Sequence, residues 1–210
     1  MSQAINQQLV ERFEEFIEAY CEKEVGVLLE NYPKKQRSLN IDWGELYRFD
    51  PNMADDFITY PDSVREAAKQ ALVNVGDLRY RTDDMLEKAH VRIYNLQELT
   101  EIREIRSKDV NTLVSVQGLI RKSTNVRPKV DVAAFECQRC ATVTNVPQTR
   151  GYQEPFACGG CERQGPFEIK FDRSTFSDTQ TLLIQESPEG LRGGEQPQSI
   201  EIHIEDDISG

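Results

Sequence analysis

The amino-acid sequence predicts an α+β fold, in which a helical bundle precedes a set of short strands that a four-cysteine segment interrupts. Three observations carry this prediction. Apolar residues recur every three to four positions over residues 3–30, as they do on one face of a helix. After Glu87 the pattern changes to the alternation that is typical of strands. Two Cys-x2-Cys pairs then lie within residues 137–161. Together these patterns indicate two kinds of structure in one chain.

The first 90 residues are interpreted as a small helical bundle. Residues 3–30 are expected to form one long helix. Asp50 followed by Pro51 predicts a further helix start, because aspartate caps helices and proline fits the first turn. Another helix is expected from residue 61 to about residue 75, with Gly76 closing it. The apolar residues of these helices are expected to form a core.

Two single residues of this region are interpreted as core residues. Cys21 stands alone in a helical pattern, and a lone buried cysteine behaves as a small apolar side chain. Trp43, the single tryptophan, ends a short segment expected to be extended, residues 38–43.

The second part of the chain is expected to be a small barrel or sandwich of short strands. The expected strands are residues 89–94, 112–120, 133–136, 143–146, 167–171, 181–185 and 199–204. The Gly/Pro-rich residues 187–197 are expected to form an irregular loop. The cysteine segment is inserted between two of these strands.

Cys137, Cys140, Cys158 and Cys161 have the spacing of a zinc ribbon. Each Cys-x2-Cys turn directs two sulfurs toward one point, so two turns supply the four thiolates that structural Zn2+ prefers. Two disulfides or four unrelated core cysteines are the alternatives. A ribbon has little core of its own, and nothing in the sequence indicates an oxidising compartment. We predict one structural Zn2+ per chain, because four cysteine ligands leave no position for a catalytic water.

The charge and hydropathy of the sequence restrict which partners and which cellular compartment can be expected. The chain has a net charge of −11, but residues 116–175 carry nine basic and six acidic residues and are the one segment that is not strongly acidic. No apolar run is long enough to span a membrane, and the N-terminus does not resemble a signal peptide. We therefore expect a cytoplasmic protein without a membrane partner. The pI of 4.8 and the scarcity of lysine suggest a salt-adapted organism.

A basic cluster follows directly on the strand expected at residues 112–120. Arg121, Lys122, Arg127 and Lys129 lie within nine residues that contain no acid. Alternation along a strand places Lys122 opposite Arg121, so the four side chains cannot all face one way. The cluster is either a solvated strand end or a patch that holds phosphates. The residues alone leave both interpretations open.

Motifs for catalysis are missing from the sequence. It contains no Gly-x4-Gly-Lys-Ser/Thr phosphate loop, no Gly-x-Ser-x-Gly elbow and no His-Glu-x-x-His helix. The adjacent acidic pairs, such as Asp55-Asp56, are best explained as solvated charge. A stand-alone enzyme therefore has no supporting motif.

Three stretches in this order resemble one known family. They are residues 114–128, the ribbon 137–161, and Gln185-Glu-Ser-Pro-Glu-Gly190 followed by residues 196–207. With Arg48-Phe-Asp-Pro51 and Ala89-His-Val-Arg92, they are similar to the N-terminal region of the archaeal minichromosome maintenance (MCM) replicative helicase, most closely its salt-adapted members. The resemblance covers essentially the whole chain.

The resemblance implies a helical subdomain, an oligonucleotide/oligosaccharide-binding (OB) barrel and a zinc ribbon inserted into that barrel. It places the helical subdomain at residues 1–90, the barrel at 91–132 and 168–210, and the ribbon at 133–167. It also implies a hexameric ring that encircles DNA, with ribbons that can join two rings head to head. The chain would then be associated with the nucleoid. Single-stranded DNA would contact Arg121, Lys122, Arg127 and Lys129, with Arg173 as a fifth candidate.

Two departures from the family pattern matter. The sequence stops at Gly210, whereas the family continues with further barrel strands, a basic hairpin and the ATPase motor, so we expect a non-catalytic module. Thr181 and Leu183 stand on a strand where many relatives carry basic residues, which weakens the DNA surface. The alternative function is a protein-interaction or oligomerisation module without DNA binding.

Overall fold

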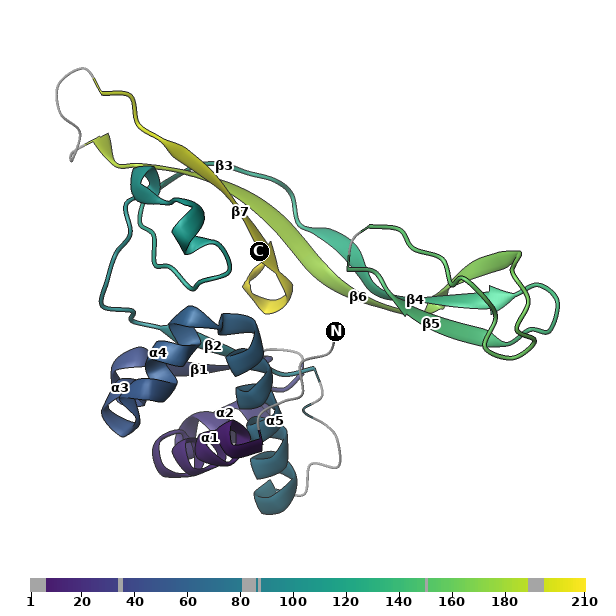
Figure 1. Ribbon diagram of the computed structural model, residues 1–210, viewed down its shortest axis with the longest axis horizontal. Helices are drawn as coiled ribbons and strands as arrows, with labels where there is room; N and C mark the ends of the chain where they lie inside the picture. Colours follow the sequence, from purple (N-terminus) through teal and green to yellow (C-terminus); the bar gives the residue numbers. More distant parts are fainter. Residues whose placement is uncertain (1–6, 34–35, 81–85, 87, 150, 189–194) are drawn as a thin grey trace. The chain divides into compact units, whose positions relative to one another are not determined.

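A computed structural model describes residues 7–33, 36–80, 86, 88–149, 151–188 and 195–210. The chain divides into two units (Figure 1). The helical unit comprises Met1–Leu119 with Gln185–Ser199, and the sheet unit comprises Ile120–Ile184 with Ile200–Gly210. The combination of helices and strands confirms the predicted α+β class. The predicted domain boundaries stay a prediction.

The helical unit contains α-helices and a small parallel sheet that share one core. The helices are α1 (Gln7–Tyr20), α2 (Glu22–Asn31), α3 (Trp43–Phe49), α4 (Pro51–Thr59) and α5 (Pro61–Tyr80). The sheet pairs β1 (Ser38–Asp42) with β2 (His90–Tyr94), and two 3-10 turns follow, η1 (Ile102–Glu104) and η2 (Ser107–Asp109). Phe13, Phe16 and Leu72 are fully buried in the core, and Trp43 is 8% exposed, as expected of a core residue. No helix among the described residues is both long and apolar enough to cross a membrane.

The prediction of one continuous helix over residues 3–30 is wrong. The structure has two helices separated at Cys21, whose φ of −115° is not helical. Backbone hydrogen bonds from Cys21 to Ile17 and from Val25 to Cys21 run through the break. Because both helices bury their apolar faces in one core, the apolar period continues and hides the break. Residues 3–6 of the expected helix lie outside the described part. Cys21 is a core residue as predicted, and its burial raises the pKa of the thiol to about 12.

The predicted start of α4 is confirmed, whereas the predicted end of α5 is wrong. The Asp50 carboxylate accepts hydrogen bonds from the backbone N–H groups of Asn52 and Met53, and Pro51 occupies the first turn. The last helix continues through the buried Gly76 to Tyr80. A glycine inside a helix costs about 1 kcal/mol relative to alanine, but the packing of α5 against α1 outweighs that cost.

The sheet unit contains a five-stranded sheet (Figure 1). Its strands are β3 (Leu119–Ser123), β4 (Arg127–Cys137), β5 (Val143–Pro147), β6 (Phe167–Gln185) and β7 (Ser199–Glu205), and a 3-10 turn, η4 (Asp206–Ile208), follows β7. The strand order is β3-β6-β4-β5, and β7 also pairs with β6. The strands expected at 167–171 and 181–185 are the two ends of the single long β6.

The strand predicted at residues 112–120 begins only at Leu119. The residues before it bond elsewhere, because Leu113 N–H donates to the Ile58 carbonyl and the Ser115 carbonyl accepts from Thr100 N–H. These bonds tie residues 112–118 to the helical unit, so they do not join the sheet. Of the irregular loop expected at 187–197, residues 189–194 lie outside the described part.

Candidate metal centre and nucleic-acid interface

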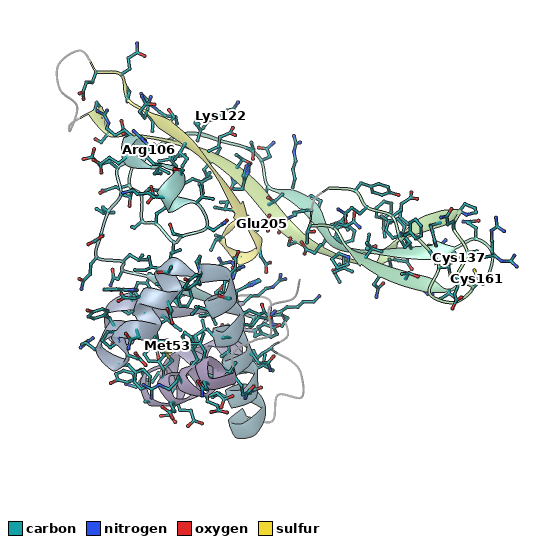
Figure 2. The ribbon with its side chains drawn as sticks, viewed as in Figure 1. Met53, Arg106, Lys122, Cys137, Cys161 and Glu205 are labelled. Atoms are coloured by element: carbon teal, nitrogen blue, oxygen red, sulfur yellow. The ribbon has the colours of Figure 1, made fainter. Side chains whose placement is uncertain are left out.

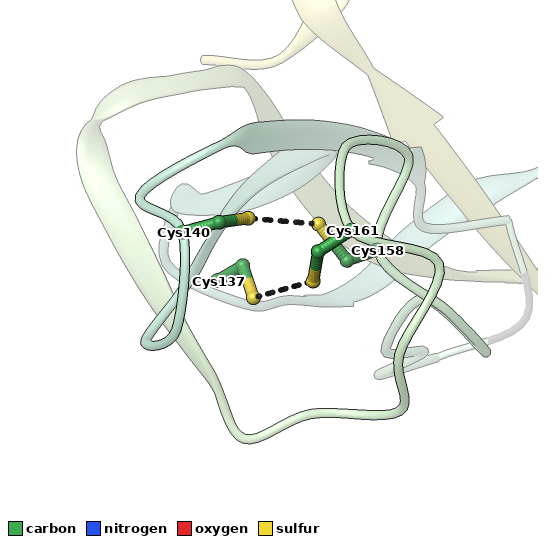
Figure 3. Close-up of side chains that lie close together, drawn as sticks. All are labelled: Cys137, Cys140, Cys158 and Cys161. Carbon is green, nitrogen blue, oxygen red and sulfur yellow. Dashed lines mark hydrogen bonds between the residues drawn. The ribbon is translucent and has the colours of Figure 1, made fainter.

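The four cysteine sulfurs meet at one point of the sheet unit (Figure 3). All four Sγ atoms lie within 4.8 Å of one another, with 3.9 Å between Cys137 and Cys161 and 3.4 Å between Cys140 and Cys158. Zinc–sulfur bonds of about 2.3 Å in a tetrahedron place sulfurs about 3.8 Å apart. The spacing therefore fits a metal ion held by four cysteines.

The two Cys-x2-Cys turns have the same backbone design. Ala141 N–H donates to the Cys137 carbonyl at 2.8 Å, and Glu162 N–H donates to the Cys158 carbonyl at 2.9 Å. Ala141 and Glu162, each directly after the second cysteine of a pair, have positive φ values of 57° and 56°. This equivalence explains why both pairs direct their sulfurs inward.

Gly160 lets the two turns approach each other. A Cβ atom at this position would collide with the side chain of Thr142, which lies in the first turn. The Gly160 N–H also points at the Cys158 sulfur, 3.3 Å away, as in a turn that stabilises a thiolate. The sequence Cys158-Gly-Gly-Cys161 is therefore suited to close packing of the turns.

The electrostatics of the cluster favour a bound cation. Hydrogen bonding to the Thr142 side chain and backbone lowers the pKa of Cys140 to about 6. At Cys161 the backbone of Arg163 lowers the pKa, but burial and the three neighbouring sulfurs outweigh this effect and raise the pKa to about 11. Four thiolates at this distance repel one another, so a divalent cation is the group that lets all four ionise together.

Two of the predicted DNA contacts share one face of the sheet. The register pairs Arg127 with Thr179 and Lys129 with Ser177. Directly paired residues point to the same side of a sheet, and so do residues two apart along a strand. Arg127 and Lys129 therefore lie on one side, which we call the polar face. Figure 2 shows Lys122 and Glu205 along this sheet, and Cys137 and Cys161 at the end where the ribbon lies.

The register of β3 separates the other two cations. Thr124 N–H donates to the Thr181 carbonyl at 3.0 Å, so Thr124 lies opposite Thr181. Thr181 is two residues from Thr179 and thus lies on the polar face. Counting back from Thr124, Lys122 falls on the polar face and Arg121 on the opposite one. The structure thus brings together Lys122, Arg127 and Lys129 but not Arg121.

Arg173 lies apart from this group, in an irregular part of β6. The pairing with β4 shifts between Lys170 and Thr175. The Ser174 hydroxyl fills the shift, accepting from Ala134 N–H and donating to the Lys170 carbonyl. The exposed Arg173 guanidinium is 4.0 Å from the Asp172 carboxylate.

The polar face also carries residues that were not predicted. His203 Nδ1 lies 3.0 Å from the Thr181 hydroxyl, and the Glu205 carboxylate lies 2.5 Å from Lys129 Nζ. A carboxylate therefore neutralises one of the three cations. Polar and apolar residues alternate in Ser199–Glu205, and this pattern could have predicted that Glu205 lies on a polar face. The pattern does not indicate which strand pairs with these residues.

Comparisons with known proteins agree with this arrangement. Residues 10–95 match the family described as "MCM N-terminal domain", and residues 101–210 match "MCM OB domain". The chain is 29% identical to DNA replication licensing factor mcm4-B of Xenopus laevis, over 81% of this chain and 20% of that protein. It is 28% identical to the minichromosome maintenance protein MCM of Saccharolobus solfataricus, over 83% of this chain and 26% of that protein.

A solved structure matches nearly the whole chain. It is described as the 1.8 Å crystal structure of the N-terminal domain of an archaeal MCM, and it matches with a TM-score of 0.76 and 29% identity. The match covers 97% of this chain and 82% of that one. The chain spans only about a fifth to a quarter of the length of the curated relatives named above. The match of residues 101–210, more than half of the sequence, shows that the chain belongs to the minichromosome maintenance (MCM) family and carries its N-terminal and OB domains.

Proposed function

We propose that this chain is the N-terminal DNA-binding and ring-assembly module of an MCM replicative helicase, and that it acts in DNA replication. In this role it is not an enzyme, and the ATPase motor belongs to the rest of such a helicase. The family match supports the replication role. The observation that carries the DNA-binding role is the placement of Lys122, Arg127 and Lys129 on one face of an OB-domain sheet.

The polar face contacts the phosphates of single-stranded DNA. The three cations follow the direction of β3 and β4, so they can bind successive phosphates of one strand. OB domains bind single strands through such a cationic surface and gain further affinity from stacking aromatics. The residues paired with Arg127 and Lys129 are Thr179 and Ser177, not aromatics, so we expect little sequence preference. Arg121 and Arg173 are candidate contacts outside this face, with smaller expected contributions.

The cysteine cluster holds one structural Zn2+. Cys137, Cys140, Cys158 and Cys161 supply its ligands, and four sulfurs fill the coordination shell. When bound, the ion cross-links the two turns and so contributes folding free energy to the ribbon. The observed sulfur spacing and the shared backbone design of the turns support this assignment.

The chain assembles with copies of itself. As in the family, we propose a hexameric ring around DNA, with the ribbons joining two rings. The ribbon presents exposed aromatic side chains, Tyr152 at 68% and Phe156 at 84% exposure, which suit a contact between copies. The proposed segments are a helical subdomain at residues 1–90, a first barrel segment at 91–132, a ribbon at 133–167 and a second barrel segment at 168–210. The proposed location is the nucleoid in the cytoplasm of a salt-adapted archaeon.

A second function is an assembly module that does not bind DNA. Two observations favour it: the net charge of −11 repels phosphates, and Glu205 neutralises Lys129. Fluorescence anisotropy with a labelled oligo-dT, combined with the mass of the protein in solution, separates the two functions. The first function is supported if the oligonucleotide binds and if Lys122→Ala and Arg127→Ala weaken that binding. Assembly without any anisotropy change supports the second.

A further inference from the structure

A groove of about 550 Å³ lies within the helical unit, and none of its lining residues belongs to the polar face or the cysteine cluster. Residues of α3, of α4 and of the segments 96–100 and 108–115 line it. Its walls are joined by backbone hydrogen bonds: Leu113 N–H donates to the Ile58 carbonyl at 2.9 Å, and Thr100 N–H donates to the Ser115 carbonyl at 2.7 Å. The groove therefore has fixed backbone walls.

One buried polar atom of a residue that lines the groove lacks a partner among the described residues. Trp43 is 8% exposed, and its Nε1 is buried without a hydrogen-bond partner among the described residues. A buried donor without an acceptor is unfavourable and calls for an explanation. The Trp43 ring stacks on Tyr47, with centroids 4.9 Å apart, and both rings line the groove. An acceptor atom of a ligand would satisfy the Trp43 N–H.

The charges at the groove select the class of ligand. Asp55, Glu98 and Asp109 line it, against a single cation, Lys108. The Asp109 carboxylate already accepts from the backbone N–H of Arg106 at 2.8 Å. Asp55 and Glu98 form no ion pair with another residue that the structure describes. The excess of carboxylates attracts cations and repels phosphates, which argues against a nucleic acid here.

We propose that this groove binds a short basic and apolar peptide segment of a partner protein. A peptide carbonyl accepts from Trp43 Nε1, an apolar side chain packs on Tyr47 and Ile58, and lysine or arginine side chains pair with Asp55 and Glu98. Because Nε1 is buried, the peptide carbonyl reaches it only when the side chains that cover it shift. None of the residues proposed to contact DNA or zinc lines this groove.

The single tryptophan makes the groove directly observable, because all tryptophan emission of the chain comes from Trp43. The probes are acetyl-Arg-Leu-Arg-Leu-Arg amide, its counterpart with glutamate at the charged positions, arginine amide and an oligo-dT. We expect the basic peptide alone to shift Trp43 emission in a saturable way. The double variant Asp55→Asn/Glu98→Gln should weaken that binding roughly 2- to 30-fold, the range for two exposed ion pairs.

The control variant is Glu66→Gln, which removes an exposed carboxylate of α5 that does not line the groove. It should bind the basic peptide like the unmodified chain. Circular dichroism verifies that each variant is folded. The proposal is overturned if the basic peptide leaves Trp43 emission unchanged, if the acidic peptide or the oligo-dT binds as tightly, or if the double variant binds normally. Equal binding of arginine amide would also overturn it and assign the groove to a small cation.

Discussion

Arg103 and Glu186 form a bidentate ion pair within the helical unit, although they lie 83 positions apart in the sequence. Arg103 Nη2 lies 2.8 Å from Glu186 Oε2, and Arg103 Nε lies 3.0 Å from Oε1. The same carboxylate accepts from the backbone N–H groups of Arg103 and Gln198. A further bond joins Arg103 to Glu195 at 2.8 Å. One arginine thus holds together Glu186, which directly follows β6, and Glu195.

This ion pair predicts a pH dependence of stability. The guanidinium of Arg103 and then the N–H of Gln198 lower the pKa of Glu186 from its ordinary 4.5 to about 2. A carboxyl group with a lowered folded-state pKa contributes stability above its unfolded pKa and loses it as the pH falls through the folded value. Glu186→Gln should therefore lower Tm at pH 7, and the difference from the unmodified chain should shrink between about pH 5 and pH 2.

Thermal melts of the unmodified chain and of Glu186→Gln from pH 7 to pH 2 measure this difference in Tm. Glu98→Gln, which removes an exposed carboxylate without an ion pair among the described residues, is the control and should change Tm little at any pH. A Tm difference for Glu186→Gln that stays constant from pH 7 to pH 2 would contradict the assignment.

Metal analysis should find about one zinc per chain, because four sulfurs satisfy one ion. Cys158→Ser should release the zinc and disorder the ribbon, while the helices, whose core does not include these cysteines, stay folded. Metal content and circular dichroism report the two effects. Cys21→Ala is the matched control, because it changes a buried cysteine outside the cluster and should keep the zinc. An ordered ribbon in zinc-free protein would exclude the structural role.

Two glycine substitutions should act in opposite directions. Gly160→Ala places a Cβ against Thr142, separates the two turns and should weaken zinc binding. Gly26→Ala, in α2, meets no atom within 4 Å and should raise the free energy of unfolding by about 0.5–1 kcal/mol. Competition with a zinc chelator and chemical denaturation measure the two effects. If Gly160→Ala retains zinc as well as Gly26→Ala does, close packing of the turns does not matter for the metal.

Glu205→Gln should strengthen DNA binding. The change removes a carboxylate from the polar face and frees Lys129, so we expect an increase in affinity of roughly 1.5- to 5-fold at low salt. Anisotropy titrations with oligo-dT measure the change. Glu66→Gln changes the net charge equally but lies on α5, and it separates the local effect from the general one. An equal gain for both variants would mean that only net charge matters.

The cysteine cluster could be predicted from the sequence because its information is local. Two residues between paired cysteines determine each turn, and the repetition of this spacing predicted that the two turns share one metal ion. The Asp50 cap and the apolar period of the helices could also be predicted, because each depends only on residues that are close in the sequence. The break at Cys21 could not be predicted, because α1 and α2 bury their apolar faces in the same core and the period continues across it.

Other features depend on pairings between distant segments. Alternation along β3 showed that Arg121 and Lys122 oppose each other. Which of them joins Lys129 depends on the register with β6, and Glu205 reaches Lys129 only because β7 also pairs with β6. The Arg103–Glu186 pair likewise exists only in the folded chain. No sequence period contains such information.

The salt dependence of oligo-dT binding tests the proposed DNA contacts most directly. Each phosphate contact releases counterions, so log affinity should fall by about 0.7 per contact for each unit of log salt. Arg127→Ala should bind more weakly and show a slope smaller by about 0.7. Arg65→Ala, which removes an exposed arginine of α5, should keep the slope of the unmodified chain. The titrations use the lowest salt at which circular dichroism shows a folded chain. An Arg127→Ala variant with unchanged affinity and slope across that range would contradict the account and leave the assembly module as the function of this chain.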